Sequence, residues 1–292
     1  MELTSTDILW LFTLPAVLAT VVMLATRPWR RGRDVAGWGA AAAIVGGFTF
    51  AFVHRFGGVP PFPPVSGQQW LFFMAVPVVL IALTQTFIRW KWFSIAASAI
   101  VLGITPWVVL RNVTYIPPRE LWTWMIGAGV GMAGWWMAME TLARRGRDGS
   151  LPLLLGAVFG VAGLALIDAH VESLGKVAGA MVLPLVIVAL AATWSRGVSL
   201  AGGGTLAAGV FLGGLLLCGR FFADLTTLNL ILLALAPLAA WAGELPGLGK
   251  PDSWKRFAVR TVSVLAVLAV PAFQAATGLK ATLDEQYESY SY

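Results

Sequence analysis

Charged residues, cysteine and histidine are scarce in this sequence of 292 residues. Charged residues make up 12% of the chain, about half the share of an ordinary soluble domain. The single cysteine, Cys218, excludes an intrachain disulfide and a thiolate metal site. Two histidines are too few for a three-histidine zinc site. These absences exclude a cytosolic enzyme, a secreted disulfide scaffold and a nucleic-acid-binding protein, and we expect no cofactor or metal.

Hydrophobic residues account for 58% of the chain, and the mean hydropathy is +0.80. The apolar stretches are long enough to cross a hydrocarbon core of roughly 30 Å as helices. We predict an all-α, polytopic transmembrane helical bundle with about ten spans, forming a single transmembrane domain over residues 1–278 and an acidic, tyrosine-rich tail over 279–292. The predicted spans are 8–26, 35–54, 70–88, 93–110, 121–142, 151–170, 177–193, 200–220, 227–243 and 261–278.

Basic residues predict the orientation of these spans, because lysine and arginine near short loops stay on the cytoplasmic side. Fourteen of the 20 basic residues fall in the loops after the odd-numbered spans, and six fall on the other side. We therefore expect both termini to be extracytoplasmic, in a membrane of the bacterial cytoplasmic (inner) type. Tryptophans near the span ends indicate anchoring belts at both surfaces.

Prolines and glycines suggest a repeat of helical hairpins. Several odd-numbered spans share an interior proline, as at Pro15, Pro77 and Pro184, and four even-numbered spans carry a glycine seven or eight residues before a polar residue at the outer end. Tandem hairpin repeats are one interpretation, and chance similarity among apolar segments is the other. Glycine pairs such as Gly127 and Gly131 are typical of close helix packing.

The middle of every predicted span is free of ionisable residues, which argues against a proton-relay pump. Glu140 lies about one turn from the inner end of its span, where it can snorkel or pair with Arg144 four residues later.

The outer end of the predicted bundle carries the candidate binding residues. Arg55, Arg111 and Arg220 terminate three even-numbered spans, and Asp168 and His170 lie at the same level. If the even-numbered helices share one axis, these groups would line a cavity that opens outward, and arginine is suited to bind phosphate or carboxylate. The alternative is that each arginine contacts ordinary lipid phosphates or pairs with Asp168, Asp224, Glu120 or Glu172.

Three functions are compatible with these sequence features. The first is a transporter or flippase-like carrier with an outward-facing site for an anionic solute or a lipid headgroup. The second is a non-catalytic structural or assembly subunit that binds a partner membrane subunit through the C-terminal tail, which we expect to be disordered and which contains Tyr287, Tyr290 and Tyr292. The third is a membrane enzyme acting on a lipid-linked substrate. No catalytic motif supports the third, so non-enzymatic functions are favoured, with membrane lipids as partners and no nucleic acid.

Overall fold

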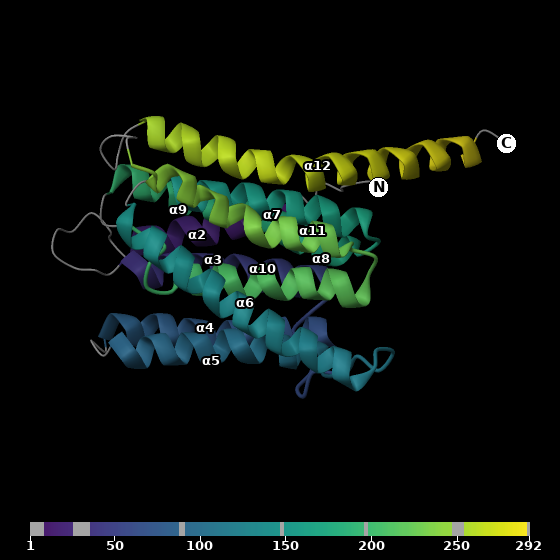
Figure 1. Cartoon of the computed structure of the whole chain (residues 1–292), viewed down its shortest axis with the longest axis horizontal. Coiled ribbons are helices and arrows are strands. Elements are labelled where there is room, and N and C mark those ends of the chain that lie inside the picture. The colour runs from purple at the N-terminus through teal and green to yellow at the C-terminus, as the bar shows by residue number, and fades with distance from the viewer. Residues whose placement is uncertain are drawn as a thin grey trace.

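The computed structural model describes residues 9–25, 36–87, 91–146, 149–195, 198–246 and 254–290, and within these ranges it contains helices and no strand. A helical segment lies over each of the ten predicted spans (Figure 1). In chain order the elements are the π-helix η1 (Leu9–Thr13), α2 (Leu14–Ala25), α3 (Ala36–Arg55), α4 (Gly67–Phe87), α5 (Lys91–Leu110), α6 (Pro118–Arg145), α7 (Ser150–Asp168), α8 (Glu172–Ala180), α9 (Val182–Trp194), α10 (Gly204–Phe222), α11 (Thr227–Leu235), the 3₁₀ helix η2 (Ala236–Glu244) and α12 (Trp254–Tyr290).

Seven helical segments among the described residues are long and apolar enough to cross a membrane, which is compatible with a polytopic membrane protein. The apolar helix from Trp10 to Ala25 is shorter than the others. Helices α3 and α6 are rich in glycine, alanine and tryptophan, and neither is among these seven segments. Ten crossings are therefore not confirmed, and the number stays a prediction.

The predicted orientation rests largely on residues outside the described ranges. These include both chain termini, and the basic residues Arg27, Arg30, Arg31, Arg33, Arg89, Arg147, Arg196 and Lys250. The location of the termini relative to the membrane stays a prediction. We call the end of the bundle that holds Arg55 and Arg220 the outer end, following that prediction, and the opposite end the inner end.

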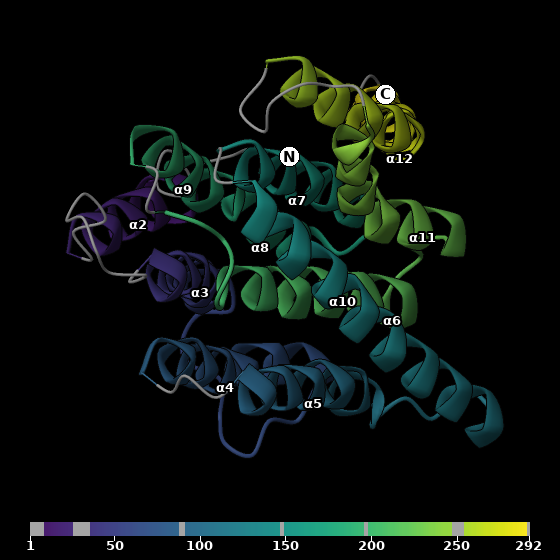
Figure 2. The ribbon, with the colours of Figure 1, turned by 60° about the vertical axis from the view of Figure 1, so that its left-hand side comes forward.

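Helix α10 lies at the centre of the bundle. It packs against α3, α4, α5, α6, α7, α8 and α11, and almost every residue from Gly204 to Phe221 is buried. Figure 2 shows α4 and α5 on one side of this helix and α12 on the opposite side, with α6 crossing obliquely over it. The helices of the second, fourth and sixth predicted spans, α3, α5 and α7, therefore all pack against α10, which is the helix of the eighth span. The side chains of α10 fill the middle of the bundle.

Prolines coincide with interruptions in three of the helical segments. Pro15 follows the junction of η1 and α2, Pro184 follows the break between α8 and α9, and Pro237 lies at the start of η2. A proline removes one backbone hydrogen bond and its ring clashes with the preceding turn, so a regular α-helix is disfavoured at these points. Pro77, Pro106 and Pro271 instead lie inside α4, α5 and α12.

Close helix packing uses glycines other than the predicted pair Gly127 and Gly131, whereas Gly209 and Gly213, predicted in the same way, do lie against Trp135 and Met132. A Cβ on Gly129 would lie 3.2 Å from the carbonyl oxygen of Gly103, and a Cβ on Gly163 would lie 2.8 Å from that of Gly175. Gly127 and Gly131 are exposed, and a Cβ on either would meet nothing within 4 Å. The glycine face of α6 is therefore open.

The hairpin repeat is not confirmed by the packing. The first two pairs, α2 with α3 and α4 with α5, are packed hairpins. Helix α6 packs mainly against α5 and α10, so the fifth and sixth predicted spans do not reproduce that arrangement.

Several boundaries differ from the sequence prediction, and α8 and α12 begin at Glu172 and Trp254, five and seven residues before the predicted span starts. Helix α10 begins at Gly204 rather than at Leu200, because Gly202 and Gly203 have φ angles of +80° and +127°, which interrupt a right-handed helix. At the other end of the chain, residues 279–290 continue α12 as a helix where we expected a disordered tail. Its 37 residues span about 55 Å, so α12 projects past the other helices at its C-terminal end (Figure 1).

Candidate functional site

Arg55, at the outer end of α3, forms an ion pair with the first residue of α8. Its guanidinium nitrogen Nη2 lies 3.5 Å from Oε1 of Glu172. The same carboxylate oxygen lies 2.6 Å from Nζ of Lys176, which is buried one turn further along α8. Arg55 thus pairs with one of the acidic residues that the sequence offered as an alternative to a ligand.

Arg111, one residue after α5, stacks on an aromatic ring of α4. Its guanidinium carbon lies 4.5 Å from the centroid of Trp70. Two hydrogen bonds hold the loop that follows. Nδ2 of Asn112 donates to the carbonyl of Val65 at 3.0 Å, and the Tyr115 hydroxyl donates to the carbonyl of Phe221. These contacts hold the α5–α6 loop over the outer end of α10.

Asp168 and His170 lie where α7 ends. The Asp168 carboxylate lies against the backbone of Gly278 in α12, where an added Cβ would overlap it. His170 is exposed and has a φ of +64°, so it marks the turn into α8. The backbone amide of Asp224 donates to the carbonyl of Ala169 at 3.4 Å, which connects this turn to the loop after α10.

Arg220, two residues before the end of α10, has no ion pair with any described residue. Its Nε is buried and has no hydrogen-bond partner in the described part of the chain. Among the three candidate arginines, it is the one whose guanidinium is not held by an acidic or aromatic side chain.

The structure therefore brings the predicted residues to one end of the bundle without joining them. The ends of α3, α5 and α7 surround the end of α10, yet Arg55 pairs with α8, Arg111 stacks on α4, and Asp168 faces α12. A single outward vestibule lined by all five residues stays a prediction.

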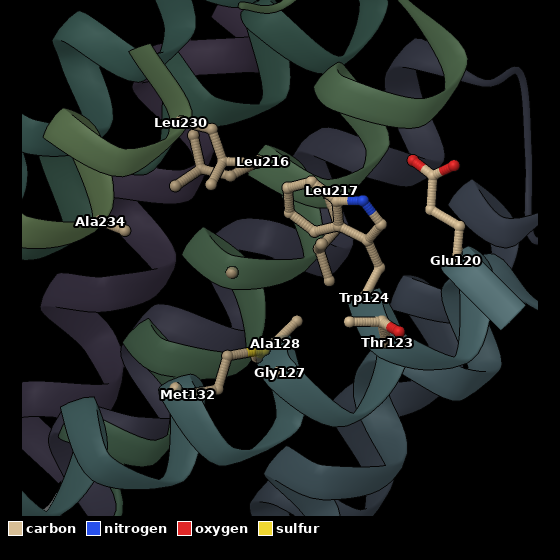
Figure 3. Close-up of a pocket in the computed structure, with 12 residues that line it drawn as sticks. Glu120, Thr123, Trp124, Gly127, Ala128, Met132, Leu216, Leu217, Leu230 and Ala234 are labelled. Atoms are coloured by element: carbon tan, nitrogen blue, oxygen red, sulfur yellow. The ribbon is translucent and has the colours of Figure 1, made fainter. Parts of the chain in front are cut away.

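An open cavity of about 520 Å³ lies between α6, α10 and α11. Figure 3 shows the side chains of Trp124, Leu217 and Leu230 around it, with Glu120 toward one end. The lining is apolar except for Glu120 and Thr123 at the outer end of α6, and Glu120 is its one charged residue. The lining residues are Glu120, Thr123, Trp124, Gly127, Ala128, Gly131, Met132, Gly213, Leu216, Leu217, Leu230 and Ala234.

The cavity exists because two helices lack side chains that would fill it. On α6 the lining positions repeat with helical spacing from Glu120 to Gly131, so that one face combines small residues with one tryptophan. On α10, Gly213, Leu216 and Leu217 form the facing stripe, and Arg220 continues that stripe by one turn toward the outer end. Arg220 could be identified from the sequence but the cavity could not, because glycine pairs on a helix are more often contacts than openings.

The inner end of α6 carries a buried carboxylate that anchors α10. Glu140 accepts hydrogen bonds from the Thr205 hydroxyl at 2.6 Å and from the Gly202 amide at 3.1 Å. Arg144 Nε also donates to Glu140 at 2.9 Å, which confirms the predicted pairing of these two residues. A carboxylate at this position is favoured by the free amides and the positive dipole end of α10.

A second buried charge holds α12 against the bundle. Arg260 is 2% exposed, and it donates to Glu244 at 2.6 Å and to the Ser150 hydroxyl at 2.8 Å. It thereby connects α12 to the end of η2 and to the start of α7. Because the predicted tenth span begins at residue 261, Arg260 falls in a predicted inner loop, whereas in the structure α12 already begins at Trp254.

Metal ligands and nucleophiles are not grouped in the part of the chain that the structure describes. The described residues contain no cluster of three or more histidine, cysteine, aspartate or glutamate side chains that could hold a metal ion. Cys218 is fully buried in α10. No family model, curated protein or solved structure matches this chain.

Proposed function

We propose that this protein is a membrane-embedded, flippase-like lipid carrier that accommodates one lipid tail in the cavity between α6, α10 and α11. The observation that supports the proposal is the cavity itself, which is apolar, open, and bordered by polar groups at its outer end only. A cavity of about 520 Å³ lies within the range of roughly 300 to 1,000 Å³ that is usual for small-molecule sites.

The open face of α6 favours entry from the side of the bundle. Thr123, Gly127 and Gly131 line the cavity and are all exposed. In a bilayer this face borders lipid, so an acyl or prenyl chain can move into the cavity without crossing water.

The headgroup would lie at the level of Arg220. Of the residues predicted to bind an anionic solute or lipid headgroup, the proposal keeps only Arg220, which lies one turn beyond the residues of α10 that line the cavity. Arg220 is not itself a lining residue, but it follows Leu216 and Leu217 by one turn on the same face of α10, and side chains on a helix lean toward its N-terminus. Arg220 forms no ion pair with a described residue, and a planar fork of guanidinium donors suits a phosphate group.

Lipid occupancy can be tested with a lipid that carries a photoactivatable group at the end of one acyl chain. We expect cross-linked peptides from 123–132 and 213–217 after reconstitution into vesicles. Replacing Gly131 by leucine should fill the cavity and remove these cross-links. Gly134→Leu is the matched control, because Gly134 lies on the same helix, is exposed and has open space beside it, but does not line the cavity.

Carrier activity needs a second measurement, since a bound lipid could also be static. Vesicles that contain a tail-labelled fluorescent lipid should show exchange between leaflets that is faster with the wild-type protein than with Gly131→Leu. Equal exchange by both proteins would contradict the carrier proposal.

A structural or assembly subunit is the second candidate, and the length of α12 favours it. The helix contacts α7 near Gly278 and continues to Tyr290 beyond the bundle. An unsupported helix of this kind is available to a partner membrane subunit. Removing residues 281–292 should then lower the apparent mass of the complex in mild detergent while the bundle stays folded, and an unchanged mass would contradict this candidate.

A further inference from the structure

The polar end of the cavity carries one group of each sign. We propose that the cavity selects zwitterionic phospholipids that carry a primary ammonium group, with the lipid phosphate bound by Arg220 and the ammonium group bound by Glu120 through N–H hydrogen bonds that a quaternary ammonium cannot donate. This inference rests on the lipid-binding function proposed above and specifies its substrate class.

Headgroup chemistry has to supply the selectivity, because the tail cannot. A lipid chain that moves from the bilayer into an apolar cavity exchanges one apolar environment for another, so the hydrophobic effect gives little net gain. The lining has a single charged residue, Glu120, and its only other polar side chain at that end is Thr123. Headgroup recognition therefore depends on Glu120 and on Arg220, which lies one turn beyond the cavity-lining residues of α10.

The relative level of the two charges follows from an aromatic contact between the helices. Trp124 of α6 packs edge-on against Phe221 of α10, with ring centroids 5.4 Å apart. Arg220 precedes Phe221, so it lies close to the level of Trp124. Glu120 lies four residues before Trp124 on α6, which places it up to about 6 Å further toward the outer end.

This order matches the order of groups in a zwitterionic glycerophospholipid. The phosphate is attached on the side of the tails, and the ammonium group follows it outward. Arg220 at the inner level is therefore complementary to the phosphate, and Glu120 at the outer level is complementary to the ammonium group. Figure 3 shows the Glu120 carboxylate beyond the indole of Trp124, on the far side from the apolar lining.

Both charges are available for a ligand. Neither Glu120 nor Arg220 forms an ion pair with a residue in the described ranges. Arg119 is adjacent to Glu120 in sequence, but neighbouring residues on a helix point in different directions. An anionic lipid without an amine would satisfy Arg220 and leave its remaining negative charge near Glu120, which is unfavourable.

The test compares lipids that share the same tails and differ in the headgroup. Wild-type protein in nanodiscs is offered equal amounts of phosphatidylethanolamine, phosphatidylglycerol and phosphatidylcholine, and the lipids retained after delipidation are counted by native mass spectrometry. We expect phosphatidylethanolamine to exceed each of the other two by about threefold, as for one solvent-exposed ion pair.

Two substitutions separate the two contacts. Glu120→Gln should abolish the preference for phosphatidylethanolamine, whereas Arg220→Gln should lower retention of all three phospholipids relative to diacylglycerol. Asp224→Asn and Lys280→Gln are the charge-matched controls, because both residues are exposed at the outer end and neither lines the cavity.

The failure of this inference differs from the failure of the proposed function. If the wild type retains phosphatidylglycerol or phosphatidylcholine equally well, or if Glu120→Gln keeps the preference, the headgroup assignment is overturned. If Gly131→Leu retains as much of every lipid as Gly134→Leu does, the cavity is not a lipid site and the proposed function fails as well.

Discussion

Replacing Glu140 by leucine should destabilise the bundle severely, although the residue is far from the cavity. Leucine has a similar size but accepts no hydrogen bond. The Thr205 hydroxyl, which is fully buried, and the Gly202 amide would then lose their acceptor. Each hydrogen bond to a buried charge contributes roughly 1.5 to 3 kcal/mol, so the expected loss in the free energy of unfolding is about 3 to 5 kcal/mol.

Variants of the same network give the expected order of effects. Glu140→Gln keeps one acceptor oxygen and should cost about 1 to 2 kcal/mol. Arg144→Ala removes an ion pair whose arginine side chain is 61% exposed, so solvent screening limits its cost to about 0.5 kcal/mol. The double substitution of Glu140 and Thr205 should show a coupling energy of about 1 to 2 kcal/mol, because the two side chains are in direct contact.

The measurement is equilibrium unfolding in mixed micelles of mild detergent and dodecyl sulfate, followed by helical circular dichroism. Glu140→Leu should unfold at a much lower dodecyl sulfate fraction than Arg144→Ala. If the two variants unfold together, Glu140 is only a surface partner of Arg144, and its role as the anchor of α10 is refuted.

Three further substitutions test the packing. Arg260→Met leaves Glu244 without its closest partner in a mostly buried position and should cost about 3 kcal/mol in the same unfolding assay. Gly163→Val should separate α7 from α8, since the Gly175 backbone lies against it, and should cost about 1 to 3 kcal/mol. Gly127→Ala, which adds a methyl group in open space, should leave the stability unchanged or raise it by up to about 1 kcal/mol through helix propensity; a loss as large as that of Gly163→Val would contradict the open face of α6.

The positions of the helices could be predicted from the sequence, because runs of apolar residues need no knowledge of neighbours. Every predicted span has a helical segment over it. What the apolar pattern could not provide is which helix lies at the centre. Helix α10 is buried on all sides, whereas α12 has a similar apolar composition but exposes Val262, Leu265 and Phe273. In a bilayer, contact with lipid and contact with protein both favour apolar side chains, so the pattern does not distinguish them.

The candidate site was predictable only in part for a related reason. Arginine at a span end is visible in the sequence, but its partner depends on tertiary structure. Arg55 pairs with a residue 117 positions later, and Arg111 stacks on one 41 positions earlier. Gly127 and Gly131 have the spacing of a helix contact, yet in the structure Gly129, between them, makes the contact with α5. A shift of two residues moves the contact to another face of the helix and leaves the predicted pair facing the cavity.

Helix α10 is held in place at both of its ends, so it is the fixed wall of the cavity. Its start is tied to α6 through Glu140, and its end is covered by the loop that Tyr115 attaches to Phe221. The wall formed by α11 is less firmly held. Helix α11 is only nine residues long and passes directly into a 3₁₀ helix of nine residues. A 3₁₀ helix is usually only a few residues long. Few buried contacts and weaker backbone hydrogen bonding correspond to low local stability. A lipid that fills the cavity should therefore stabilise α11 and leave α10 unaffected, so that amide hydrogen exchange slows in 227–235 on lipid binding and does not change in 205–221.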